Sequence, residues 1–204
     1  GIYDDLIQYQ LSGRPNMSVV NMLNAKYIIQ NNGKEPVAMR NPGALGNAWF
    51  VNAVHWVNGP VEEMKALDNL NPLDTAVIDQ SFKTSIPAFT PADSTATIRQ
   101  TQFNNDTIRY ESNSTQAHLA VFSEIYYKDW NAYIDGQKTP YAKANYVLRA
   151  MVVPAGKHQI EFRFEPGVFF TGRSISFYSG WLVALLLLGW ILYLLIPIGK
   201  KKQS

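Results

Sequence analysis

Cysteine is absent from the 204 residues of this chain, and histidine occurs only three times. Without cysteine the protein has no disulfides, no thiolate metal ligands and no thiol nucleophile. This absence does not indicate the cellular compartment, because a secreted bacterial protein of this size does not require disulfides. The histidines, His55, His118 and His158, fall in three separate expected strands without the spacing of metal ligands. The sequence therefore predicts no metal site.

An excess of positive charge is also missing from most of the chain. The formal net charge of +2 arises from three adjacent lysines, Lys200, Lys201 and Lys202, and the remainder is slightly negative. A nucleic-acid ligand requires a basic stripe, which the scattered lysines and arginines do not form, so no nucleic-acid partner is expected. Disorder is excluded, because 47% of the residues are apolar and 13% are aromatic. The length allows one or two compact units.

Catalytic motifs are lacking as well. The chain has no Gly-x-Ser-x-Gly elbow and no glycine-rich phosphate loop. The adjacent acidic pairs Asp4-Asp5 and Glu62-Glu63 do not suit a two-carboxylate mechanism, because neighbours on a helix diverge. No catalytic residue and no cofactor are therefore predicted, and this chain is not expected to be catalytic by itself.

One long apolar run lies close to the C-terminus. Residues 180–197 contain no charge, and with the preceding residues they are long enough to cross the hydrocarbon core. A buried core helix would carry more polar positions, so a transmembrane helix is predicted at 174–198. Trp181 suits an interfacial anchor. Lys200, Lys201 and Lys202, in the basic tail 199–204, predict a cytoplasmic C-terminus by the positive-inside rule, which leaves the preceding part extracytoplasmic.

Small residues recur every fourth position in this helix, at Gly172, Ser176, Gly180 and Ala184. They share one face, which would allow another helix to approach closely. The chain begins with glycine and has no signal peptide, although its bulk must be translocated. An upstream region of the same parent protein, with further spans, is therefore expected as a partner of this helix.

The soluble part divides into two segments of different character. The first, residues 1–93, is expected to form a small α/β subdomain, because strand, helix and strand patterns follow one another. Helices are expected from about residues 2, 18 and 60, and Pro60 suits the first turn of the last one. The expected strands of this segment are 26–30, 48–57 and 75–79.

The second segment, residues 94–166, contains short β patterns separated by turn residues. Its expected strands are 95–103, 107–112, 118–124, 131–134, 147–153 and 158–164. Asp135-Gly136 is a strong hairpin signal. The alternation of apolar and polar residues in 158–164 predicts a strand with one buried and one solvent-exposed face. We expect a mainly β fold with an α+β N-terminal piece, in which a β-sandwich or jelly roll precedes one C-terminal transmembrane helix.

A concentration of aromatic residues is the one functional hint. Tyr126, Tyr127, Trp130 and Tyr133 precede the Asp135-Gly136 hairpin, and Asn145 is a nearby amide candidate. Sugar rings stack on such platforms while amides or acids bond their hydroxyls, so these five residues are candidates for glycan binding. The alternative is that Trp130 and Tyr133 fill the sandwich core while the tyrosines pave its edge near the membrane.

Several blocks resemble the C-terminal end of the YfhO family of bacterial membrane proteins. They are MLNAKYII at 22–29, NPGALGNAWFV at 41–51, the long block from YYKDWNAYIDG to FRFEP at 126–166, and the closing apolar helix. The resemblance covers most of the chain and includes the order of the blocks. The long block is the most specific.

This resemblance implies a large polytopic protein similar to glycosyltransferases of the C superfamily. Such enzymes transfer sugars from polyprenyl-phosphate donors on the outer side of the cytoplasmic membrane, in some members to polymers such as lipoteichoic acid. Their catalytic acids lie in loops near the N-terminal spans, so none is carried over to this chain. Two hypotheses follow: a membrane-anchored accessory domain that binds a glycan or polyprenyl-linked sugar, or a structural or protein-partner-binding domain without a glycan role.

Overall fold

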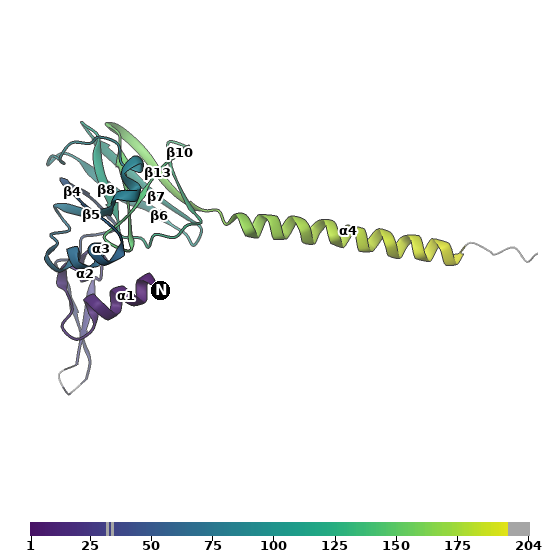
Figure 1. Ribbon diagram of the computed structural model, residues 1–204, viewed down its shortest axis with the longest axis horizontal. Coiled ribbons are helices and arrows are strands. Elements are labelled where there is room, and N and C mark those ends of the chain that lie inside the picture. The colour runs from purple at the N-terminus through teal and green to yellow at the C-terminus, as the bar shows by residue number, and fades with distance from the viewer. Residues whose placement is uncertain (32, 34, 196–204) are drawn as a thin grey trace, which may run out of the picture. The chain divides into compact units, whose positions relative to one another are not determined.

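The structure is a computed structural model that describes residues 1–31, 33 and 35–195. The chain divides into two compact units, Gly1–Phe164 and Glu165–Ser204. The first is mostly β with a small helical part at its N-terminus, and the described part of the second is helix α4 (Gly167–Leu195) (Figure 1). The expected mainly β class with one C-terminal apolar helix is therefore confirmed.

Short helices lie at the N-terminus and between strands β4 (Ala53–Val57) and β6 (Thr97–Phe103) of the first unit, and several of them pack apolar residues against the core. They are α1 (Ile2–Leu6), the π-helical turn η1 (Ile7–Leu11), α2 (Met17–Met22), α3 (Pro60–Ala66), and the 3-10 turns η2 (Leu67–Asn69) and η3 (Gln80–Ser85). Asn16 caps α2, because its side chain accepts a hydrogen bond from the Ser18 amide. Pro60 begins α3, as its fixed φ favours. Leu6 and Leu67 are fully buried.

Thirteen strands form three sheets in the described part of the first unit. A two-stranded hairpin pairs β1 (Tyr27–Gln30) with β2 (Val37–Arg40). The five-stranded sheet has the order β10 (Gln137–Thr139), β9 (Trp130–Ile134), β13 (Gly156–Phe164), β7 (Thr107–Ser114) and β6 (Thr97–Phe103). The six-stranded sheet has the order β3 (Ala48–Val51), β8 (His118–Phe122), β12 (Leu148–Val153), β11 (Ala142–Ala144), β5 (Thr75–Asp79) and β4 (Ala53–Val57).

The two larger sheets pack face to face as a β-sandwich. Their shared core contains Tyr110 and Phe162 from the five-stranded sheet and Phe122 and Met151 from the six-stranded sheet. The rings of Phe122 and Phe162 meet edge to face with centroids 5.0 Å apart. A second core lies on the other side of the six-stranded sheet, where its strands meet the helices through residues such as Val19 and Leu67.

The two soluble segments share one sheet. Strands β3, β4 and β5 come from residues before 93, and they join β8, β11 and β12 in the six-stranded sheet. The expected subdomains 1–93 and 94–166 therefore fall, up to Phe164, in the single compact unit Gly1–Phe164. The expected strand 48–57 is two strands, because the chain breaks at Asn52 and β3 pairs with β8 while β4 pairs with β5.

The second unit is a single helix in its described part. Ile175–Tyr193 within α4 is long and apolar enough to span a membrane, and every side chain of this stretch is exposed within the unit. Uniformly apolar exposure fits a helix that lipid surrounds. The expected span 174–198 agrees with this helix up to Leu195, and residues 196–198 lie outside the described residues.

Candidate functional surfaces

The aromatic candidates lie on two different surfaces of the sandwich. Ala132 and Ile134 of β9 point into the core, so Trp130 shares their side of the sheet and Tyr133 lies on the outer side. Cross-strand pairing confirms the division, because Trp130 lies opposite Phe164 whereas Tyr133 lies opposite Glu161. The sequence grouped Trp130 and Tyr133 together, but the structure does not form one platform from them.

Trp130 lies at the end of the sandwich core, where a buried arginine covers its ring. The Arg149 guanidinium carbon is 4.4 Å from the Trp130 ring centroid and 4.9 Å from that of Phe162. Arg149 Nε and Nη2 donate hydrogen bonds to the Ile125 carbonyl at 3.0 and 2.8 Å. The guanidinium thus occupies a position over the Trp130 ring that a sugar would need for stacking, and burial lowers the pKa of Arg149.

The remaining sequence candidates differ in exposure. Tyr127 is exposed, and its ring centroid is 6.2 Å from that of Phe164. Tyr126 is half-buried against Phe82. Asn145 is fully buried, and its side-chain oxygen accepts a hydrogen bond from the Val77 amide at 2.8 Å. Asn145 therefore joins the turn before β12 to β5, and in this conformation it does not reach a glycan on the surface.

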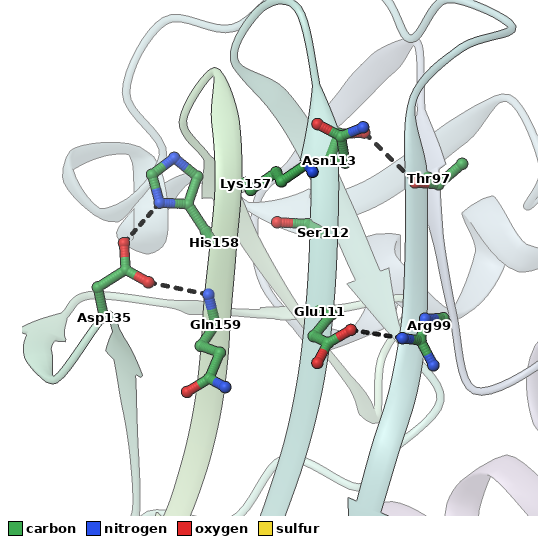
Figure 2. A pocket seen from close by; sticks show the side chains of 9 residues that line it. All are labelled: Thr97, Arg99, Glu111, Ser112, Asn113, Asp135, Lys157, His158 and Gln159. Carbon is green, nitrogen blue, oxygen red and sulfur yellow. Dashed lines mark hydrogen bonds and ion pairs between the residues drawn. The ribbon is translucent and has the colours of Figure 1, made fainter.

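The outer face of the five-stranded sheet is polar and carries a pocket of about 400 Å³. Side chains from three adjacent strands and from the β9–β10 turn line it (Figure 2). They are Thr97, Arg99, Glu111, Ser112, Asn113, Asp135, Lys157, His158 and Gln159. The strands are brought together by the register that places Lys157 opposite Asn113 and Gln159 opposite Glu111. This register gives the pocket a floor of amide and charged groups.

A histidine–aspartate pair forms one wall of the pocket. His158 Nδ1 lies 2.6 Å from Asp135 Oδ2, and His158 Nε2 lies 3.0 Å from the Ala155 carbonyl oxygen. Both ring nitrogens face acceptors, which favours the protonated imidazolium. The hydrogen bond with Asp135 accordingly raises the pKa of His158, and the same bond lowers the pKa of Asp135.

The turn that holds Asp135 explains the geometry of the pair. Asp135 and Gly136 have φ of 50° and 82°, as expected for the predicted Asp-Gly hairpin between β9 and β10. Asp135 Oδ1 accepts a hydrogen bond from the Gln159 amide at 2.9 Å, so the carboxylate is fixed by two bonds (Figure 2). Asp135 and His158 also border a second cavity of about 520 Å³, which Val152 and Pro87 help to line.

The other charges of the pocket are distributed unevenly. Arg99 pairs with Glu111 at 2.5 Å, but both side chains are well exposed, so the pair contributes little stability. The Lys157 side chain is exposed and has no hydrogen bond or ion pair to any described residue. With His158 protonated, the pocket therefore carries one more positive than negative charge.

The polar face continues beyond the pocket toward Tyr133. Arg109 donates to Glu161 at 3.0 Å and to the Gln102 side chain at 2.8 Å. The Arg163 guanidinium carbon lies 4.3 Å from the Tyr133 ring centroid, and Arg163 also pairs with Glu161. Hydrogen bonds from the two arginines lower the pKa of Glu161. The alternation in 158–164 predicted this wet face, whereas the pocket residues from β6 and β7 were not identified from the sequence.

A buried ion pair lies on the other side of the six-stranded sheet. Glu63 of α3 bonds Lys143 of β11, and its second oxygen accepts a hydrogen bond from the Tyr146 amide at 3.0 Å. Burial raises the pKa of Glu63 despite the lysine. Both charges have partners inside the unit, so this pair holds α3 against the sheet and is not exposed to a ligand.

The remaining sequence predictions concern metal binding and the membrane helix with its basic tail. Within 1–31, 33 and 35–195, no three His, Asp or Glu side chains come together as a metal site. Trp181 lies on α4, and its ring centroid is 6.4 Å from that of Phe177. The small residues Gly172, Ser176, Gly180 and Ala184 lie on α4, where spacing by four places them on one face, and their packing against another helix stays a prediction. Lys200, Lys201 and Lys202 lie outside the described residues.

Part of the chain matches a known protein family. Residues 80–176 match the family model described as bacterial membrane protein YfhO. The matched region begins at η3, includes strands β6 to β13 and reaches into α4. No curated protein and no solved structure matches the chain. The match over residues 80–176 supports assignment of this region to the YfhO family of bacterial membrane proteins.

Proposed function

We propose that the unit Gly1–Phe164 is an extracytoplasmic accessory domain of a polytopic membrane glycosyltransferase, with α4 as its last span and the lysine tail in the cytoplasm. The domain binds or positions a glycan during sugar transfer from a polyprenyl-phosphate donor to a cell-envelope glycopolymer. The membrane helix and the YfhO match support the membrane part of this proposal.

The polar pocket on the five-stranded sheet is the observation that carries the glycan role. Sugars present many hydroxyl groups, and the pocket offers amide, carboxylate and ammonium groups to bond them. Its shallow position on a sheet suits a long polymer, because the ligand can extend past both ends. Lys157, which has no described partner, suits a phosphate or carboxylate on such a polymer.

Tyr133 is the aromatic residue best placed to take part. It lies on the same outer face as Gln159 and Glu161, whereas Trp130 lies on the core side beneath Arg149. A sugar that extends from the pocket along β13 would approach the Tyr133 ring and the Arg163 guanidinium that lies over it. We therefore assign the glycan contacts to the pocket and Tyr133.

A titration of the detergent-solubilised chain tests this assignment. The probes are glycosylated glycerol-phosphate oligomers and, as a neutral comparison, malto-oligosaccharides. We expect Gln159→Ala and Lys157→Met to weaken binding of the phosphate-bearing probe by about tenfold each, since a charged hydrogen bond contributes roughly 1.5 kcal/mol or more. Lys83→Met is the matched control, because Lys83 is also an exposed lysine but lies on η3 outside the pocket. If neither probe binds at millimolar concentration, the proposed glycan role is wrong.

A second candidate function is recognition of a protein partner through the β1–β2 hairpin. Its strands carry four well-exposed apolar side chains, Tyr27, Ile29, Val37 and Met39. A two-stranded ribbon has marginal stability alone, so exposed apolar residues on it favour a covering partner. If Ile29→Lys with Met39→Lys disrupts assembly with upstream membrane spans while pocket variants leave sugar transfer unchanged, the structural function replaces the glycan function.

A further inference from the structure

Apolar side chains gather at the end of the sandwich from which the membrane helix leaves. Phe103 ends β6 and is 61% exposed, Tyr127 precedes β9 and is 51% exposed, and Phe164 ends β13 and is 36% exposed. They come from distant parts of the sequence. Pairing of the strands brings them together, because Phe164 lies opposite Trp130 and the Phe164 amide bonds the Asp106 carbonyl in the turn after Phe103.

The segment between β8 and β9 completes this end. Ile125 is 39% exposed, and its carbonyl oxygen accepts both hydrogen bonds from buried Arg149. The Tyr141 hydroxyl donates to the Trp130 carbonyl at 2.9 Å. Hydrogen bonds from Arg149 and Tyr141 therefore fix the loop that carries Ile125 and Tyr127. We refer to Phe103, Ile125, Tyr127 and Phe164 as the aromatic end.

The short connection to α4 limits how far Phe164 can lie from the membrane helix. Only Glu165 and Pro166 separate Phe164 from the first residue of α4, which limits the distance between the two Cα atoms to about 11 Å. The eight residues from Gly167 to the apolar stretch at Ile175 add about 12 Å at the helical rise. Phe164 thus lies within roughly 23 Å of Ile175, the first residue of the candidate span, whatever the angle between the two units.

We propose that the aromatic end inserts into the lipid headgroup region, so that the domain contacts the bilayer through Phe103, Ile125, Tyr127 and Phe164. Tyr127 combines an apolar ring with a polar hydroxyl, which is favoured at this depth, and Phe103, Ile125 and Phe164 add exposed apolar surface. The sequence neighbours of the aromatic end carry charges of both signs, because Lys128 and Asp129 follow Tyr127 and Arg163 and Glu165 flank Phe164. Insertion therefore depends on the rings rather than on attraction to anionic lipids.

Single cysteines in this cysteine-free chain provide a direct test. Phe103→Cys and Tyr127→Cys are each labelled with an environment-sensitive fluorophore, and the full chain is reconstituted in vesicles of phosphatidylethanolamine and phosphatidylglycerol. We expect a blue shift of the emission and quenching by lipids that carry a nitroxide near the headgroup. Both side chains are well exposed in the unit, so the label replaces them without opening the core.

Leu73→Cys is the matched control, because Leu73 is 58% exposed and lies at the opposite end of the sandwich, next to Asp74, whose carbonyl bonds the Asn52 amide after β3. A label there should show neither the blue shift nor the quenching. If labels at 103 and 127 are quenched no more than the label at 73, the proposal is overturned. The measurement needs no saccharide, so its result is independent of the glycan role.

Discussion

Arg149 is the residue whose replacement tests most sharply how the aromatic end is held. It is 2% exposed, it bonds the Ile125 carbonyl twice, and its guanidinium lies over the rings of Trp130 and Phe162. Its Nη1 is buried and has no hydrogen-bond partner among the described residues. The charge is thus stabilised by a carbonyl, two rings and the electrostatic attraction of the half-buried Glu124 carboxylate, which makes no direct ion pair with it.

Arg149→Lys keeps the charge but loses the planar fork. One of the two hydrogen bonds from a charged donor is lost, which costs roughly 1.5–3 kcal/mol, and the stacking over two rings weakens by about 1 kcal/mol. The expected loss of unfolding free energy is about 3 kcal/mol, or roughly 6–12 °C in Tm for a chain of this size. Arg149→Met removes the charge and the unpartnered Nη1 but leaves the Ile125 carbonyl unpaired, so we expect a smaller loss of about 1–2 kcal/mol.

Urea unfolding of the full chain in detergent micelles measures both losses. Arg99→Lys is the control, because the Arg99 side chain is 72% exposed and its exposed ion pair predicts a change below about 0.5 kcal/mol. If Arg149→Met destabilises the protein more than Arg149→Lys, the positive charge itself stabilises this end, and the explanation from hydrogen-bond geometry and stacking is refuted.

Three further changes follow from the described contacts. Lys143→Met leaves the Glu63 carboxylate buried without its cation, so we expect a loss on the order of 3 kcal/mol at pH 7 by urea unfolding, and a smaller loss in acid, where a proton neutralises the carboxylate. Asp135→Asn should lower the pKa of His158 in an NMR titration; the pair stabilises the fold most between about pH 4 and 6.5, and this contribution is lost as pH rises through the raised pKa of His158. Gly156→Ala places a Cβ 3.3 Å from His158 Nε2 at a φ of 117°, which should cost about 1–3 kcal/mol in the same unfolding assay; an unchanged midpoint would contradict the strain.

The strands with clear alternation were predictable from the sequence. Residues 158–164 show one apolar and one polar side, and they form most of β13. The Asp135-Gly136 turn was also identified correctly. The short strands β2, β10 and β11 were missed, because three or four residues carry too little periodicity to separate a strand from a loop. The break at Asn52 depends on two different pairing partners, which the local sequence does not encode.

The candidate site was predictable only in part. Trp130 and Tyr133 are three residues apart in a strand, so the period of two already places them on opposite faces. The pocket, in contrast, depends on the register that aligns β6, β7 and β13, and register is a tertiary property. Arg149 lies within the YfhO-like block 126–166, but its role was not predicted, because a buried arginine is exceptional and its two aromatic neighbours come from different strands.

Topology in intact bacterial cells is the measurement on which the proposed function depends most. Gln159→Cys places a single thiol on the exposed polar face, and Ser204→Cys places one at the C-terminus of the otherwise cysteine-free chain. If the domain is extracytoplasmic, a membrane-impermeant maleimide added to intact cells labels Cys at position 159, and it labels position 204 only after the cells are lysed. Labelling of position 204 and protection of position 159 in intact cells would place the domain in the cytoplasm and contradict its role at the outer surface.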